Sequence, residues 1–202
     1  MVNTVTFRDF EERDIDFIYK CKNDEKLNSM IVGDYHPFTY EEATKWVHGC
    51  MGEHETYKFW AIATNDDDNR IIGWVSLSEI DYMNKSACFH GLVIGDPNYH
   101  DGFTWIESYL HVYKYAFEHL GLNRVYGVRL AEHKQTKAIG MAMFSQTEGI
   151  LRQAAYKNGK YHDMAMGALL SQDYYEHKEK GDYEIPAIIR RIKKIKKELD
   201  ER

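Results

Sequence analysis

Residues 88–110, CFHGLVIGDPNYHDGFTWIESYL, decide how the rest of the chain is interpreted. The segment opens with an apolar strand pattern that stops at Gly95, Asp96 and Pro97, and it continues through a polar turn into a long aromatic-rich helix. The first amides of such a helix have no intrahelical partner and carry partial positive charge. We therefore expect the turn at residues 99–105 to bind an anionic group such as a phosphate.

The segments on either side predict an α/β domain. Apolar residues recur with a period of two where we expect strands and with a helical period where we expect helices. The predicted strands cover residues 4–8, 58–64, 71–80, 87–94, 124–130, 148–157 and 160–170. The predicted helices cover residues 14–23, 39–48, 103–120 and 133–144. This order predicts a mixed, mostly antiparallel central sheet flanked by helices, not a doubly wound parallel sheet.

Three local signals mark where these elements begin, turn and end. Thr39 and Glu42 have the spacing of a capping box, in which each side chain bonds the other residue's backbone amide. Gly121 follows the long helix at the position where a left-handed backbone suits glycine. Asn158 and Gly159 suit a type I′ turn, so we expect the last two strands to form a hairpin.

The composition fits one globular domain. The chain has 202 residues, of which 44% are hydrophobic and 14% aromatic, enough to enclose a sizeable core. A net charge of −6 argues against general nucleic-acid binding, and three widely spaced cysteines argue against a disulfide framework. The sequence has no apolar run of about eighteen residues and does not begin with a signal-peptide pattern. We therefore expect no membrane span and a cytoplasmic location.

The whole pattern resembles the GNAT N-acetyltransferases, in particular the branch that acetylates ribosomal-protein N-termini, spermidine and nucleotide-linked amino sugars. The similarity extends over roughly residues 5–176, and the order and spacing of the matching pieces carry it. These pieces are FRDFEERDIDFIYKCKND, FTYEEATKWV, IIGWVSL, GLVIGDPNYH, HLGLNRVYG, EGILRQAAYKNGKYHD and ALLSQDYYE.

The resemblance implies a GNAT-like fold in which two strands splay apart and acetyl-CoA lies in the gap. The strand at residues 89–94 would offer backbone groups to the pantetheine arm, and the loop after it would hold the pyrophosphate. The acceptor amine would attack the thioester directly. The residues implied for cofactor binding are Leu92, Val93, Ile94, Gly102, Phe103, Thr104, Trp105 and His133.

Two features depart from the family pattern. The family loop carries glycines at alternate positions, where this chain has Asp101, Phe103 and Trp105, while Gly102 is out of phase. Larger side chains can point away and leave the amides available, but a carboxylate is unfavourable beside a pyrophosphate. The family also often has a tyrosine that acts as an acid on the helix predicted at residues 133–144, and this chain has none there.

Acetyl transfer to an amine needs a base, and two residues are candidates. His90 lies on the predicted central strand, where a neutral imidazole can accept the amine's proton directly or through water. The alternative for His90 is a hydrogen-bonded strand histidine. Glu79 ends the neighbouring strand, within reach of a cleft between strand ends, and its alternative is a solvated turn residue. An unpaired strand amide at residues 92–94 would serve the oxyanion.

Two further groups are candidates for ligand contacts. Tyr35, His36 and Phe38 precede the second helix, in a loop that lines the acceptor pocket in the family. Their rings suit stacking on a sugar or base, and the alternative is a packed loop. His133, Lys134 and Lys137 suit contact with the cofactor phosphates, and the alternative is a solvated helix face.

The spacing of the other reactive residues argues against a covalent nucleophile and against a metal site. Cys88 has no histidine and aspartate partners placed by spacing. The ten histidines are scattered, and none forms the H-E-x-x-H or H-x-x-E-H pattern of a zinc site.

Residues 179–202 form a basic, amphipathic helical tail, which we separate from the acetyltransferase-like domain at residues 1–178. Three interpretations are open: the helix packs back on the domain, it forms a helix–helix contact in a homodimer, or it binds an acidic partner or membrane surface. The apolar seam consists of Ile188, Ile192, Ile195 and Leu199.

Together these observations predict an acetyl-CoA-dependent N-acetyltransferase that acts on a primary amine of a small molecule. The aromatic loop favours a nucleotide-linked amino sugar, while a protein N-terminus or a polyamine stays open as the acceptor. An alternative from another class is a catalytically degenerate GNAT-fold binding or assembly module. The glycine-poor loop and the missing tyrosine motivate that alternative.

Overall fold

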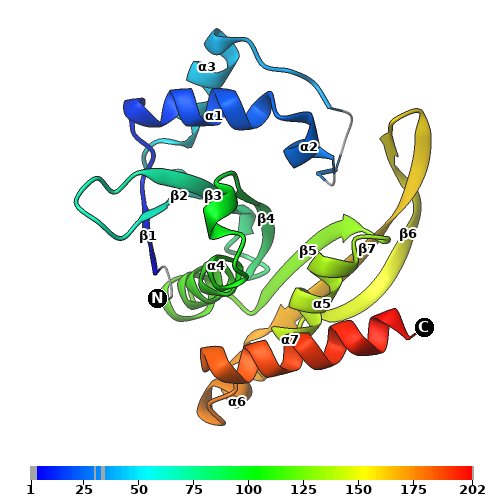
Figure 1. Cartoon of the computed structure of the whole chain (residues 1–202). Helices are drawn as coiled ribbons and strands as arrows, with labels where there is room; N and C mark the ends of the chain where they lie inside the picture. Colours follow the sequence, from blue (N-terminus) through cyan, green and yellow to red (C-terminus); the bar gives the residue numbers. More distant parts are fainter. Residues whose placement is uncertain (1–3, 30, 33–34, 202) are drawn as a thin grey trace.

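The structure, a computed structural model, describes residues 4–29, 31–32 and 35–201. Its strands form one sheet in the order β1-β2-β3-β4-β5-β7-β6 (Figure 1). The strands are β1 (Val5–Arg8), β2 (Lys58–Thr64), β3 (Ile71–Asp81), β4 (Ser86–Ile94), β5 (Arg124–Leu130), β6 (Gln146–Lys157) and β7 (Lys160–Leu170). The β4–β5 pair is parallel and the other neighbouring pairs are antiparallel. The predicted mixed, mostly antiparallel sheet is confirmed.

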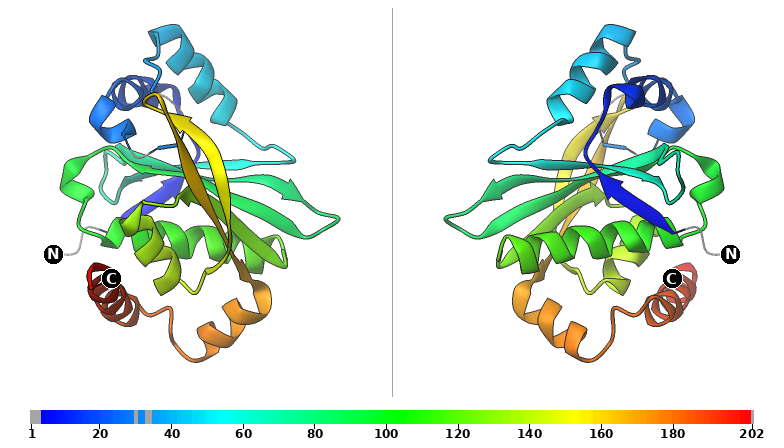
Figure 2. Two further views of the ribbon diagram at one scale, coloured as in Figure 1. Left: turned by 90° about the vertical axis from the view of Figure 1, so that its right-hand side faces the viewer. Right: turned by 90° about the vertical axis from the view of Figure 1, so that its left-hand side faces the viewer.

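Helices cover both faces of the sheet (Figure 2). The helices are α1 (Ile15–Lys22), α2 (Glu25–Asn28), α3 (Tyr40–Cys50), α4 (Phe103–Tyr113), α5 (Lys134–Ala142), α6 (Ser171–Glu179) and α7 (Ile185–Asp200). Two short 3₁₀ helices, η1 (Glu12–Asp14) and η2 (Pro97–Tyr99), and a π-helix, η3 (Lys114–His119), complete the helical elements of the described residues. Trp74 packs into a cluster with α1 and α3, and the next residue, Val75, packs into the cluster that contains α4. Strand β3 is therefore buried on both faces, because successive side chains of a strand alternate.

The local signals read from the sequence are confirmed. The Thr39 hydroxyl accepts from the Glu42 amide at 3.2 Å, and the Glu42 carboxylate accepts from the Thr39 amide at 2.7 Å. Asn158 and Gly159 both have positive φ, 51° and 74°, as a type I′ turn requires. Gly121 has φ of 62° after the long helix.

The long helix and two short ones differ from the prediction. Regular α4 ends at Tyr113, and the chain continues as η3, closed by a bond from the Leu120 amide to the Tyr115 carbonyl at 2.9 Å. Apolar periodicity does not distinguish this wider turn from an α-helix, so the sequence predicted one helix over 103–120. Helices α2 and α6 were not predicted, because both are polar and α2 is only four residues long.

The tail helix α7 packs back on the domain, which confirms the first interpretation of the tail. Ile188 is 0% exposed and shares a buried cluster with Ile106 of α4 and Ile139 of α5. The Arg191 guanidinium donates to the Ala142 carbonyl at 3.0 Å. A dimer seam that uses Ile188 is therefore wrong, because this side chain is already enclosed within its own chain. A division at residues 178 and 179 stays a prediction.

The structure also bears on three expectations from the composition: the state of the cysteines, metal binding and membrane spans. Cys21, Cys50 and Cys88 are buried free thiols. Within residues 4–29, 31–32 and 35–201, no group of three or more histidines, cysteines or acidic residues is arranged to hold a metal ion. In the same part of the chain, every helix is too short or too polar to cross a membrane.

Candidate active site

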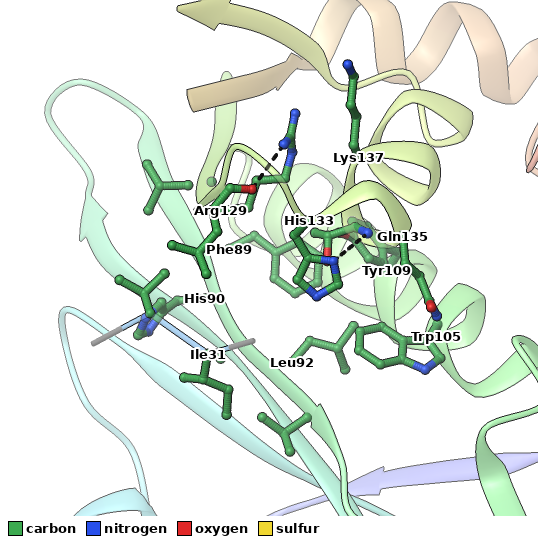
Figure 3. Close-up of a pocket in the computed structure, with 18 of the residues that line it drawn as sticks. Ile31, Phe89, His90, Leu92, Trp105, Tyr109, Arg129, His133, Gln135 and Lys137 are labelled. Atoms are coloured by element: carbon green, nitrogen blue, oxygen red, sulfur yellow. Dashed lines mark hydrogen bonds between the residues drawn. The ribbon is translucent and has the colours of Figure 1, made fainter. Parts of the chain in front are cut away.

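The candidate site opens where β4 and β5 part. Their parallel pairing is confined to residues 86–88 on β4 and 124–126 on β5. Beyond it β5 pairs with β7, and β4 keeps β3 as its strand neighbour on one edge. A pocket of about 790 Å³ fills this gap (Figure 3). The arrangement is the splayed strand pair that the resemblance implied.

The splayed part of β4 presents a free backbone edge to the pocket. Val93 pairs with Trp74, and Ile94 pairs with Gly73, so these contacts occupy one edge of the strand. The opposite edge presents N–H and C=O groups without a strand partner, which can bind an extended ligand. Leu92, Val93 and Ile94 all line the pocket, and their contact with the cofactor stays a prediction.

Strand alternation and a bulge place His90 on the acceptor side of the sheet. The Phe89 ring packs on Tyr109 of α4, with 4.5 Å between ring centroids, so the next side chain lies on the opposite face. Gly91 follows with φ of 69°, and the Ser76 hydroxyl donates to the His90 carbonyl at 2.7 Å. The His90 imidazole is exposed and lines the pocket on the same side as Ile31 (Figure 3). This position suits a base that meets an incoming amine.

Glu79, the other candidate base, does not line this pocket, and its role as a base stays a prediction. It lines a separate hollow of about 540 Å³, together with Trp46, Tyr57 and Phe59. Its backbone is left-handed, with φ of 51°, and its carboxylate accepts a hydrogen bond from the Tyr126 hydroxyl. A register shift in the β3–β4 pairing lies at this residue, and the Tyr126 that donates to it lines the main pocket.

Asp101 occupies the amides at the start of α4. Its carboxylate accepts from the Phe103 amide at 2.9 Å and from the Thr104 amide at 3.3 Å. Gly102 is the N-cap residue, with φ of 87°. Gly102, Phe103 and Thr104 do not line the pocket, whereas Trp105 does. The predicted phosphate cradle at this turn is thus already filled by a carboxylate of the chain itself.

Helix α5 supplies polar groups on the other side of the pocket. His133 is its N-cap, and the ring Nδ1 accepts from the Thr136 amide at 3.4 Å. Burial lowers the pKa of His133, so the ring is mainly neutral near pH 7. Gln135 and Lys137 line the same pocket. Gln135 was not among the predicted site residues.

Two more lining residues, Tyr109 and Arg129, were also missed. Burial raises the pKa of Tyr109 to about 12, so the phenol stays protonated near pH 7 and can donate a hydrogen bond. Arg129 is half-buried on β5, and burial lowers its pKa. Tyr109 fits the pattern of an ordinary core helix, and Arg129 fits that of an ordinary strand. Only the tertiary structure brings the two side chains to one cavity.

Another wall of the pocket is formed by the chain that follows α1, and we expect the acceptor to bind there. Leu27, Ile31 and Val32 line it, and Asp24 supplies the sole carboxylate among the described lining residues. Tyr35, His36 and Phe38, predicted as acceptor contacts, do not line the pocket. The Phe38 ring instead faces the Lys22 ammonium at 5.2 Å, beneath α3. Their contact with the acceptor stays a prediction, which the described lining of this pocket does not support.

Comparison with known proteins gives a consistent result. The family of the acetyltransferase (GNAT) domain matches residues 4–143. Spermidine N(1)-acetyltransferase of Vibrio cholerae is 24% identical over 181 residues, 89% of this chain and all of that protein. The uncharacterized N-acetyltransferase YoaA of Bacillus subtilis is 23% identical over 158 residues, 77% of this chain and 87% of that protein.

Solved structures share the fold. Spermidine N-acetyltransferase from Vibrio cholerae, in complex with CoA and spermine, superimposes with a TM-score of 0.74 at 22% identity, covering 85% of this chain and 98% of that one. A GNAT-family acetyltransferase from Bacillus anthracis has a TM-score of 0.71 at 18% identity, with coverage of 85% and 98%.

Proposed function

Because the chain belongs to the acetyltransferase (GNAT) family and is an acetyl-CoA-dependent N-acetyltransferase, we propose that its acceptor is a small aliphatic amine with a second ammonium group, such as a diamine or polyamine. Acetyl-CoA supplies an acetyl thioester to the reaction. The acceptor must enter as a free amine, because a protonated one has no lone pair for attack.

The acceptor wall is the observation that carries this proposal. It combines apolar Leu27, Ile31 and Val32 with Lys26 and a single carboxylate, Asp24, which also accepts from the Leu27 amide at 3.0 Å. Apolar side chains suit a methylene chain, and Asp24 suits the distal ammonium of a diamine. The spermidine acetyltransferase activity of a 24%-identical relative supports the same class. A nucleotide-linked amino sugar is less well supported, because the aromatic residues expected to stack on it do not line the pocket.

Three groups of this chain have roles in the proposed mechanism. His90 accepts a proton from the acceptor amine on the open side of β4. The free backbone edge of β4 donates hydrogen bonds to the negative charge that develops on the acetyl oxygen. The Tyr109 hydroxyl holds its proton on the opposite side of the sheet, where it can donate to the leaving sulfur in place of the missing α5 tyrosine.

An acceptor screen tests the proposal. Thiol release from acetyl-CoA is measured with 1,4-diaminobutane, spermidine, n-butylamine, an amino-sugar nucleotide and a short peptide. We expect diamines and polyamines to give the highest kcat/KM, and Asp24→Asn to raise KM for diaminobutane far more than for butylamine. Preference for the sugar nucleotide or the peptide would contradict the acceptor class, and no release with any amine would contradict turnover itself.

A further inference from the structure

The cofactor's phosphate groups need cationic or amide partners, and the α4 turn is poorly suited to supply them. Two of its amides already bind the Asp101 carboxylate, at 2.9 and 3.3 Å. Seating a phosphate there requires either displacing this carboxylate or placing two anions in contact. Either step opposes binding. Trp105 adds bulk at the pocket end of the same turn.

The opposite side of the pocket has the complementary charge. Arg129 on β5 and Lys137 on α5 both line it, as does His133 (Figure 3). The carboxylate of the described lining, Asp24, lies on the acceptor side, in the segment that leads into α2. The cofactor side thus presents cations without an acidic side chain among the described lining residues.

Of the two cationic side chains, Arg129 has a charge that its own hydrogen bonds compensate only weakly. Its guanidinium is half-buried, and its hydrogen bonds are to the carbonyls of Leu130 and Ala131, both at 3.4 Å. Such long contacts with its own neighbouring backbone compensate a buried cation weakly. Burial raises the pKa of neighbouring Tyr109 to about 12, so near pH 7 this phenol is uncharged and does not neutralise the guanidinium.

We propose that Arg129, together with Lys137, binds the phosphate groups of the cofactor from the β5–α5 side of the pocket, while Asp101 takes the anion position at the start of α4. The planar guanidinium offers a fork of donors that matches phosphate oxygens, and Lys137 adds a second charge. An anion thus still lies at the N-terminus of α4, but it is the Asp101 carboxylate of the chain itself and not a cofactor phosphate.

Cofactor binding by calorimetry, without turnover, tests this proposal. The ligands are CoA, pantetheine, which lacks the phosphates, and inorganic pyrophosphate as a competitor. We expect Arg129→Met to weaken CoA binding about 10- to 100-fold and pantetheine binding less than about 2-fold. Arg129→Lys should recover part of the loss, and pyrophosphate should compete with CoA in the wild type. Arg190→Met, on the exposed part of α7, is the matched control.

The variant Asp101→Asn distinguishes phosphate binding at the start of α4 from phosphate binding at Arg129 and Lys137. Its amide oxygen can still cap α4, but it carries no charge. We expect its CoA affinity to stay within about 3-fold of the wild type, since the phosphates lie elsewhere. A gain of about tenfold or more would place the phosphates at α4 and overturn the proposal. An equal loss of CoA and pantetheine binding in a folded Arg129→Met protein, checked by circular dichroism, would also overturn it.

Discussion

The ammonium of Lys157 lies 2.9 Å from the carbonyl oxygen of Ile31, although the two residues are 126 positions apart in the chain. It also donates to the Asn28 carbonyl at 3.2 Å, and Lys157 is only 3% exposed. Lys157 ends β6, at the turn of the β6–β7 hairpin, which reaches toward α2 in Figure 1. The hairpin therefore holds the segment that forms the acceptor wall.

Replacing Lys157 should loosen acceptor binding and leave the cofactor side intact. Lys157→Met keeps the length of the side chain but removes the hydrogen bonds to the two carbonyls. We expect KM for the amine to rise about tenfold, with CoA affinity unchanged. Steady-state kinetics with varied amine, and calorimetry with CoA, measure the two effects. Lys160→Met, exposed on the same hairpin, should change neither, and equal effects of the two variants would contradict the inferred hold.

His90→Gln should impair the chemical step. If the imidazole accepts the amine's proton, kcat/KM should fall about 10²- to 10⁴-fold while CoA binding stays unchanged. The exposed His119 on η3 provides the matched control, as His119→Gln. A His90→Gln enzyme that retains the wild-type rate would remove His90 from the mechanism.

His111 should make the fold sensitive to mild acid. It stacks on Phe7 at 4.0 Å, and burial lowers its pKa from 6.5 to about 4. The unfolded state binds a proton near pH 6.5 and the folded state does so only near pH 4, so stability falls as the pH drops through this window. The loss amounts to about 2–3 kcal/mol. Thermal melts at pH 7 and pH 5 should converge in His111→Phe, and an unchanged pH dependence in this variant would exclude His111 as the cause.

The tail helix should contribute to global stability. Ile188 is fully buried among residues of α4 and α5, so Ile188→Ala should lower the free energy of unfolding by about 2–4 kcal/mol. Ile195, only partly buried, should cost less than about 1 kcal/mol as Ile195→Ala. Denaturant unfolding measures both changes. Equal and negligible losses would show that α7 is dispensable for the fold.

Much of the architecture was predictable from local patterns. Every predicted strand is present, and the Thr39 capping box and the Asn158 and Gly159 turn formed as expected. These features depend on residues only a few positions apart, whose conformational preferences hold in any tertiary context. The family resemblance added the splay between β4 and β5, because the order of the elements fixes their neighbours.

The candidate site was predictable only in part. His90, within the central strand, and Glu79, at the end of the neighbouring strand, were both predicted as candidate bases, yet only His90 of the two lines the main pocket. The difference comes from bulges in the β3–β4 pairing, which depend on register between two strands. Arg129 and Tyr109 were overlooked because each fits its local pattern as an ordinary strand or helix residue.

The sequence by itself determined the strands, the α-helices other than α2 and α6, their order, and the turn at residues 99–105 as the place where this chain departs from its family. Only the tertiary structure decided what that departure does. The contact of the Asp101 carboxylate with the amides of α4 is local, but the packed fold brought Arg129 and Lys137 to the opposite wall of the same pocket. The reason is physical: hydrogen bonds at a turn follow from residues close in the chain, but the charge of a cavity depends on which distant side chains the packed sheet and helices place together.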